Sequence, residues 1–185
     1  MSWSREEIEE TVERWLEINR KAEELGDWTI MAEMYTEDAT YGWNYGPGIE
    51  FMAVGRDQIR ELALGVEMEG LGGWEYPYMA KIIDPEQGFF VGFWKQFAGG
   101  LRPDGTPYEI AGIGGSWFKY GGNHQWCWQR DWFDLGNAAA LFIELMEKGM
   151  LSEGMTKRMT RRMAVGENGL YPVHQAPVGI WDIPE

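Results

Sequence analysis

The pattern of apolar positions changes character about residue 73. Over residues 5–25 the apolar side chains recur at helical spacing, which predicts an amphipathic helix. Ser4 and Glu7 form a capping box at its start, and Asn19 interrupts the apolar stripe. The apolar members of this stripe are Ile8, Val12, Trp15, Leu16 and Ala22. Two shorter helices are predicted over residues 27–35 and 55–66, with strands over residues 39–45 and 49–54.

Strand-like alternation takes over after residue 73. It predicts four strands, over residues 74–83, 88–98, 107–120 and 123–134. The short links between them imply antiparallel neighbours. A further helix is predicted from Gly136 to about residue 148. We therefore expect an α+β protein in which three N-terminal helices pack in a strongly curved mixed or antiparallel sheet that forms a cone.

The chain has the length of one domain, which we assign to residues 1–150, followed by a tail over residues 151–185. The tail holds a basic helical piece with Lys157, Arg158, Arg161 and Arg162. It also carries apolar residues that do not suit a free tail, so we expect it to pack on the body or on a partner subunit. These are Leu151, Met155, Met159, Leu170, Tyr171, Val178, Ile180 and Trp181.

Composition narrows the possible partners. The net charge of −14 opposes nucleic acid and anionic membrane surfaces, and 11 Trp, 8 Tyr and 8 Phe favour a pocket for an apolar or aromatic small molecule. His124, His174 and the single Cys127 show no metal-ligand spacing, and no phosphate loop is present, so we expect no metal or organic cofactor. The opening MSWSREEIEE does not resemble a signal peptide, and we expect a cytoplasmic protein without a membrane span.

The stretch over residues 121–135, GGNHQWCWQRDWFDL, carries the most informative chemistry. Simple alternation places Asp131 on the same face as Cys127, Gln129 and Phe133. A carboxylate in such partly apolar surroundings either finds a cation and hydrogen-bond donors or has its pKa raised, and an acid/base enzyme uses both. The alternatives are a structural ion pair with a neighbouring strand, or a residue at the strand end that reaches solvent.

Three more polar groups are candidates to converge with Asp131. These are Lys95, Tyr41 and Asn44. Lys95 lies on the otherwise apolar strand GFFVGFWKQF, and Asp131 is its expected partner. The alternatives are a purely structural pair, or a lysine that faces outward.

The opposite face of the 123–134 strand predicts an interface. Simple alternation puts Trp126, Trp128 and Trp132 there together, as an apolar stripe. Because such a stripe would be an exposed patch in a monomer, we expect a homo-oligomer, most simply a dimer.

The order of elements and four segments resemble the nuclear-transport-factor-2-like (SnoaL-like) superfamily. The segments are GDWTIMAEMYTEDATY (26–41), GRDQI (55–59), GTPYEIAG (105–112) and WQRDWFDLG (128–136). The resemblance covers residues 5–148 and implies a cystatin-like α+β barrel. Because this fold hosts many functions, it does not by itself imply an activity.

Within the superfamily, WQRDWFDL is most similar to the last strand of the limonene-epoxide-hydrolase group. The resemblance makes Asp131 the residue that deprotonates the attacking water, with Tyr41 holding that water; the Asn of the group falls on Trp43, with Asn44 one residue later. The Arg and second Asp of the group fall on Lys95 and Phe97 in the preferred register, and on Trp94 and Gln96 in the register shifted by one. Neither register supplies an acid that could protonate an epoxide oxygen.

Two other groups of the superfamily bear on the catalytic candidates. The base of the ketosteroid isomerases aligns with Trp43. Enzymes similar to scytalone dehydratase use His and Tyr, which makes His124 a candidate if a bulge at residues 121–123 turns it inward.

Three function classes follow. The first is a cofactor-free acid/base lyase or isomerase that carries out elimination, dehydration or deformylation on a bulky aromatic molecule, such as a lignin-derived diaryl compound. The second is an epoxide hydrolase, and the third is a polyketide cyclase or a non-catalytic binding module. The catalytic candidates are Asp131, Lys95, Tyr41 and His124. The expected substrate-binding residues are Trp43, Asn44, Tyr45, Phe93, Phe97, Tyr108, Ile110 and Phe133.

Overall fold

A computed structural model describes residues 3–160 and 168–185 of the chain. The first helix, α1 (Arg5–Leu25), is confirmed with the predicted bounds. Ser4 caps it by accepting a hydrogen bond from the Glu7 amide, and Gly26 ends it in a left-handed conformation with φ of 65°.

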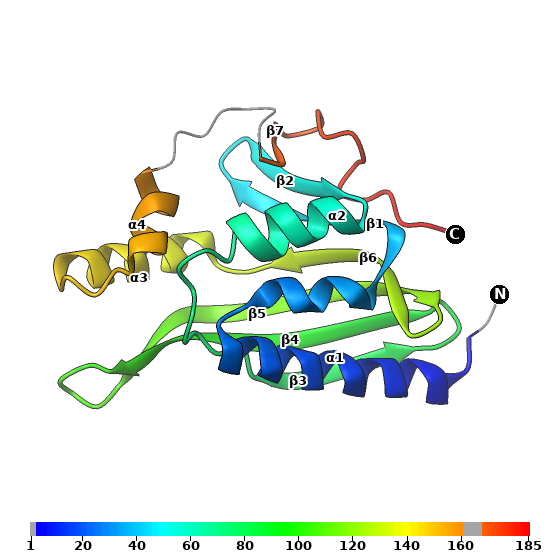
Figure 1. The fold of residues 1–185 in the computed structure, drawn as a ribbon, viewed down its shortest axis with the longest axis horizontal. Coiled ribbons are helices and arrows are strands. Elements are labelled where there is room, and N and C mark those ends of the chain that lie inside the picture. The colour runs from blue at the N-terminus through cyan, green and yellow to red at the C-terminus, as the bar shows by residue number, and fades with distance from the viewer. Residues whose placement is uncertain (1–2, 161–167) are drawn as a thin grey trace.

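The remaining elements follow the predicted order, and one strand was not predicted (Figure 1). The 27–35 segment forms a 3-10 helix, and the 55–66 segment is α-helical for one turn and then π-helical. The short strand near the C-terminus, β7, was missed because only three residues form it. The elements after α1 are η1 (Trp28–Met34), β1 (Tyr35–Gly46), β2 (Ile49–Val54), α2 (Arg56–Gln58), η2 (Ile59–Val66), β3 (Tyr78–Asp84), β4 (Phe89–Leu101), β5 (Pro107–Gly122), β6 (Gln125–Trp132), α3 (Leu135–Glu147), α4 (Glu153–Thr160) and β7 (Leu170–Pro172).

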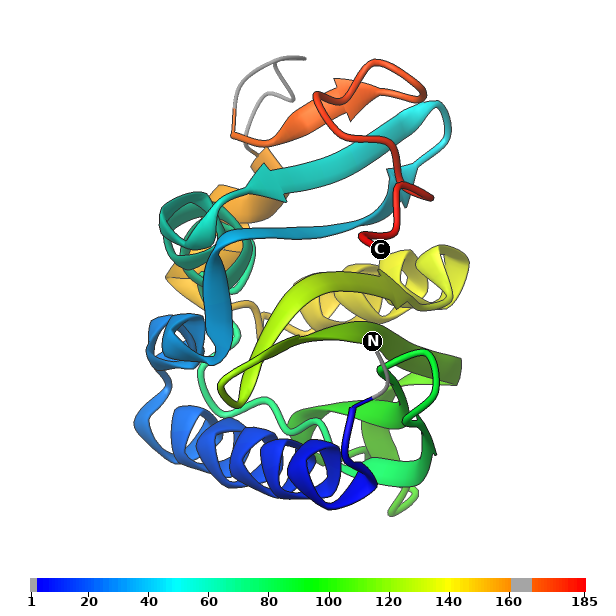
Figure 2. The ribbon, with the colours of Figure 1, turned by 90° about the vertical axis from the view of Figure 1, so that its right-hand side faces the viewer.

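Within the described residues the strands form one seven-stranded mixed sheet in the order β3-β4-β5-β6-β1-β2-β7. All neighbours are antiparallel except β1 and β6, which are parallel. The sheet is open, with β3 and β7 at its edges, and the strongly curved cone that we predicted is not formed (Figure 2).

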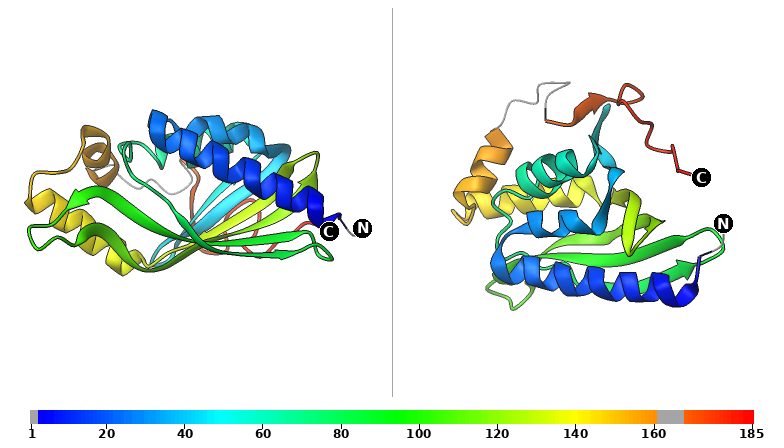
Figure 3. Two further views of the ribbon diagram at one scale, coloured as in Figure 1. Left: turned by 90° about the horizontal axis from the view of Figure 1, so that it is seen from below. Right: turned by 45° about the vertical axis from the view of Figure 1, so that its right-hand side comes forward.

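α1, η1 and η2 lie on one face of the sheet, as the view from below shows (Figure 3, left). α1 lies across that face and buries Ile8, Val12 and Trp15 against it. α3 and α4 lie together at one end of the molecule (Figures 1 and 3). The candidate site lies between the helices α1, η1, η2, α3 and α4 and the middle of the sheet.

The predicted outer stripe of tryptophans is wrong for Trp126. Lys119 pairs with Trp128 and Tyr120 with Trp126, so Cys127 is an extra residue that bulges out of β6. The bulge reverses the alternation, and Trp126 is fully buried against the rings of Phe118 and Tyr120 in the core.

The tail lies against the outer face of the sheet at β6. The buried Arg130 guanidinium donates to the carbonyl oxygens of Ile180 at 2.8 Å and Gly179 at 3.3 Å, and Trp181 contacts the Trp117 ring. Trp128 is completely buried, with the Arg130 guanidinium 4.5 Å from its ring. The tail and Arg130 therefore cover part of the face that we had assigned to a partner. Arg161 and Arg162 lie outside the described residues.

Candidate active site

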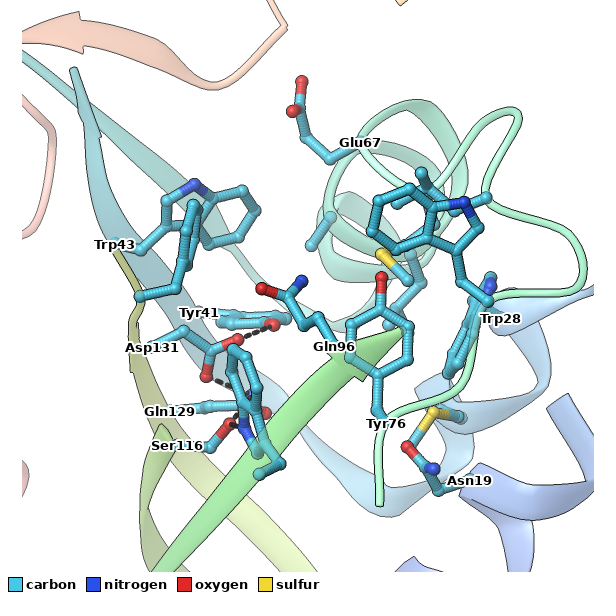
Figure 4. A pocket seen from close by; sticks show the side chains of 18 of the residues that line it. Asn19, Trp28, Tyr41, Trp43, Glu67, Tyr76, Gln96, Ser116, Gln129 and Asp131 are labelled. Carbon is cyan, nitrogen blue, oxygen red and sulfur yellow. Dashed lines mark hydrogen bonds between the residues drawn. The ribbon is translucent and has the colours of Figure 1, made fainter. Parts of the chain in front are cut away.

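A pocket opens between the helices and the inner face of the sheet, with a cavity volume of about 120 Å³ (Figure 4). Its walls are mainly aromatic, and its polar groups come from α1, β1, β3 and the segment before it, β4, β5, β6, α4 and the residue that follows η2. An engineered protein cavity of about 150 Å³ holds one benzene ring. The cavity therefore suits one aromatic ring, and the two-ring substrate that we expected would have to extend out of it.

Strand register places Asp131 at the centre of the sheet side of the pocket. On β6 the side chains of Gln129 and Asp131 both face inward. Asp131 pairs with Ser116 of β5 on one side and with Trp43 of β1 on the other. Tyr41 of β1 lies opposite Gln129 in the same ladder. The β5–β6 hairpin and the sequence-distant strand β1 thus bring their polar side chains together around one carboxylate.

Hydrogen bonds hold the Asp131 carboxylate in place. The Tyr41 hydroxyl donates to Oδ2 at 2.5 Å, and Nε2 of Gln129 donates to Oδ1 at 2.8 Å (Figure 4). The Gln129 carbonyl oxygen accepts from the Tyr35 hydroxyl in turn. Because the Gln129 amide is occupied on both sides, its orientation is fixed and the carboxylate is preorganised.

Burial raises the pKa of the Asp131 carboxyl above its usual range. Hydrogen bonds from Gln129, Ser116 and Tyr41 and the positive charge of Arg130 act in the opposite direction but only partly offset burial. Arg130 itself points to the outer face, where burial lowers its pKa to about 10. Among the described residues Asp131 thus has no ion-pair partner inside the pocket, and its side chain is half-buried.

The phenols around Asp131 remain protonated at neutral pH. Burial and the negative charge of Asp131 raise the pKa of Tyr35 and of Tyr41 well above the usual value. Burial likewise raises the pKa of Tyr76 to about 12. These groups therefore act as neutral hydrogen-bond donors rather than as bases.

Lys95 does not join the cluster, so the expected Lys95–Asp131 pair is wrong. Its ammonium lies 3.4 Å from Oε2 of Glu109 on the outer face, with a side-chain exposure of 46%. The register between β4 and β5 shifts between Trp94 and Gln96, where the extra residues lie on β5, and regular alternation along β4 turns Trp94 and Gln96 into the pocket. Of the two residue pairs that we considered, Trp94 and Gln96 therefore face the pocket, and Lys95 and Phe97 do not. The Phe97 ring lies near the Lys95 ammonium and does not line the pocket.

His124 lies far from this cluster, in the turn between β5 and β6. It has a positive φ of 57°, and its Nδ1 is 3.0 Å from the Thr11 hydroxyl oxygen on α1. Its Nε2 is 3.9 Å from Oε2 of Glu10. The β5–β6 register does shift at Gly121, within the segment where a bulge was expected, but His124 stays in the turn and contacts α1. A second shift, at Cys127, turns Trp126 inward.

The expected substrate-binding residues divide into two groups. Trp43, Ile110 and Phe133 line the pocket. The other five do not: Asn44, Tyr45, Phe93, Phe97 and Tyr108. Asn44 is exposed, the Phe93 ring contacts Trp132 on the outer face, and the Tyr108 hydroxyl accepts a hydrogen bond from Lys148.

Several pocket residues were not among the candidates, although some left a signal in the sequence. Gln129 shares the predicted face of Asp131. Asn19 is the polar residue that interrupts the stripe of α1; it lines the pocket and donates to Oε1 of Glu23 at 2.8 Å. Ser116 and Tyr35 gave no local signal, because only the strand register brings them to Asp131.

The described part of the chain shows neither a metal-binding cluster nor a membrane-spanning helix. Over residues 3–160 and 168–185, no three His, Cys, Asp or Glu side chains gather in a way that could hold a metal ion. Among the helices described there, none is long and apolar enough to cross a membrane.

Comparison with known proteins identifies the fold. No family model matches the chain, and no curated protein sequence matches it. Solved structures do match. An NTF2-like protein from Anabaena variabilis is 19% identical with a TM-score of 0.53, over 72% of this chain and 94% of the other.

Two further structures give the same result. A candidate SnoaL-like polyketide cyclase from Jannaschia is 16% identical with a TM-score of 0.55, over 76% of this chain and 96% of the other. A phenazine biosynthesis-related protein from Pseudomonas aeruginosa is 14% identical with a TM-score of 0.55, over 80% and 84%. The chain therefore has the NTF2-like, SnoaL-like fold, and nothing in these matches supports the limonene-epoxide-hydrolase group.

Proposed function

We propose that the protein is a cofactor-free acid/base enzyme, a lyase or isomerase, which acts on a hydrophobic molecule with one aromatic ring in the pocket. The observation that supports this most directly is the Asp131 carboxylate. It faces an aromatic cavity, accepts hydrogen bonds from Tyr41 and Gln129, and has its pKa raised by burial. A raised pKa makes the carboxylate a stronger base, and the aromatic walls exclude competing water.

In the proposed elimination, Asp131 takes a proton from the carbon next to a carbonyl group of the substrate. The electron pair of that C–H bond forms the new C=C bond, and the hydroxyl on the next carbon leaves. The proton held by Asp131 then passes to the leaving hydroxide and forms water, so the enzyme returns to its starting state. Loss of formaldehyde or a double-bond shift would use the same base.

Negative charge that develops on the substrate carbonyl oxygen needs a donor inside the pocket. Gln96 lines the pocket, and its carboxamide lies between Tyr76 and the Asp131–Tyr41 pair (Figure 4). We assign to it the role of polarising that oxygen. In the register shifted by one, Gln96 falls where the epoxide-hydrolase group has its second Asp, the acid that protonates the epoxide oxygen. Because an amide cannot protonate an epoxide oxygen, we favour elimination over epoxide hydrolysis.

A non-catalytic binding module is the second candidate, since a fold alone does not imply catalysis. The distinguishing experiment measures turnover of a β-hydroxy ketone that carries one phenyl ring, by the ultraviolet absorbance of the conjugated enone product. We expect Asp131→Asn to reduce turnover by about 100-fold or more, the usual contribution of a general base.

The matched control is Glu109→Gln, which removes a carboxylate from the outer face and should leave turnover unchanged. Wild-type turnover in Asp131→Asn would remove Asp131 from the mechanism. Binding of the ketone with no turnover across a panel of such substrates would support the binding module instead.

A further inference from the structure

One part of the pocket wall comes from the C-terminal segment. Arg158 of α4 lines the pocket, and its Nη2 lies 3.3 Å from Oε2 of Glu67, the residue that follows η2. The Glu67 side chain is only 2% exposed and that of Arg158 is 19% exposed. Glu67 lies well apart from the Asp131–Tyr41 pair (Figure 4). The pocket therefore has a second charged region, away from the proposed base.

Specific contacts fix α4 in this position. Gly154 and Gly70 approach so closely that a Cβ on Gly154 would lie 2.6 Å from the Gly70 backbone. The Ser152 hydroxyl donates to the Gly70 carbonyl oxygen at 2.8 Å, and Lys157 pairs with Glu69 at 3.7 Å. The position of the Arg158 guanidinium is thus set by the packing of the helix that carries it.

The surroundings of Arg158 combine aromatic rings with the buried hydroxyl of Tyr76. Its guanidinium lies 5.9 Å from the centre of the Phe142 ring, which stacks on Trp74. Its positive charge acts to lower the pKa of Tyr76, so the two groups are near each other. Within the described residues the buried Tyr76 hydroxyl has no partner in strict hydrogen-bond geometry, although the Gln96 carboxamide lies close enough to act to lower its pKa. Such a group indicates a place for a polar ligand atom.

We propose that Arg158 binds a carboxylate group of the substrate, while Asp131 acts on the distant end of the same molecule. This proposal rests on the proposed function, which makes the pocket around Asp131 the active site. Among the residues that line the pocket, Arg158 is the only basic one described. A guanidinium presents five N–H donors in a fork that suits a carboxylate, and the contact with Glu67 leaves donors for a ligand.

Two further points support a ligand role over a purely structural ion pair. The chain has a net charge of −14, so an anionic ligand is repelled at long range and needs a local cation. The distance of 3.3 Å between Nη2 of Arg158 and Oε2 of Glu67 is also longer than the ~2.7–2.9 Å of a strong charge-assisted hydrogen bond. Glu67 serves in this proposal as the positioning residue that orients the guanidinium.

The test compares two ligands of nearly equal shape, cinnamate and cinnamamide, by calorimetry on the full chain. We expect the wild type to bind cinnamate more tightly, by about 10-fold to 100-fold, the range for hydrogen bonds to a charged group. Arg158→Met should bring this ratio close to one, and Arg158→Lys should give an intermediate ratio because an ammonium lacks the fork. Lys157→Met, on the same helix, should keep the wild-type ratio.

Equal binding of the two ligands by the wild type would overturn the proposal. So would an equal loss of both ligands in Arg158→Met, because this indicates that Arg158 only holds α4 in place. If Arg158→Met does not fold, the ratio in Arg158→Lys decides. Failure of the proposed function is recognised separately: the ligand ratio would depend on Arg158 while turnover of the neutral ketone would not depend on Asp131.

Discussion

The dependence of stability on pH offers a stringent test of the environment assigned to Asp131. Burial raises the pKa of this carboxyl in the folded protein above its value in the unfolded chain, which is about 3.9 for Asp. A group of this kind favours folding while it is protonated. Its contribution is fully present below the unfolded pKa and is lost as pH rises through the folded pKa. Ionised Asp131 therefore opposes folding at neutral pH.

Asp131→Asn should make the protein more stable at neutral pH while reducing its activity. The amide has the same shape, and it can pair with Gln129 through its oxygen and with the Tyr41 hydroxyl through its NH₂ group. Replacing each charge-assisted bond by a neutral one loses roughly 1 kcal/mol, whereas desolvation of an ion amounts to several kcal/mol. Each kcal/mol of net gain raises Tm by about 2–4 °C in a chain of this size.

The assay is a series of thermal melts of the wild type and the variant from about pH 4, near the unfolded pKa of Asp, to pH 8. We expect the Tm difference to be smallest at the acid end and to grow with pH. Glu109→Gln, which changes an exposed pair with Lys95, should follow the wild type within about 0.5 kcal/mol at every pH. A variant less stable than the wild type at neutral pH, or a difference that does not change with pH, would refute the reasoning.

Three further predictions follow from the described contacts. Gln129→Leu removes a hydrogen-bond donor from Asp131, so the acid limb of the pH profile of kcat/KM should move to higher pH. It also leaves the buried Tyr35 hydroxyl without its acceptor, so the free energy of unfolding should fall by about 1–3 kcal/mol. An acid limb at the wild-type pH would contradict this prediction. Lys95→Met breaks only an exposed pair and should leave turnover and Tm nearly unchanged, so a large loss of turnover would restore Lys95 to the site. We still predict a dimer, formed through the outer face of the sheet around Trp132, which is 37% exposed. Light scattering should detect the dimer, and Trp132→Glu should weaken it. A wild-type monomer at micromolar concentration would refute the prediction.

The sequence by itself determined the elements whose signals are local. The stripe of α1 with its capping box predicted that helix, and the strand over residues 49–54 was predicted with its observed bounds. The order of the elements and the superfamily resemblance gave the α+β class and the NTF2-like fold. The alternation around Asp131 also placed Gln129 on the same face, and both residues do line the pocket.

Only the tertiary structure decided what depends on strand pairing. The bulge at Cys127 turns Trp126 into the core. On β4 the alternation is regular, and only the packing of the sheet decides that the face with Trp94 and Gln96 lines the pocket while the face with Lys95 lies outside. A bulge is set by hydrogen bonds to the partner strand, so a period-two pattern read along one strand cannot locate it. For the same reason Ser116 meets Asp131 only once β5 and β6 are in register. The sequence thus predicted that Asp131 faces inward with Gln129, and the tertiary structure decided which other side chains surround it.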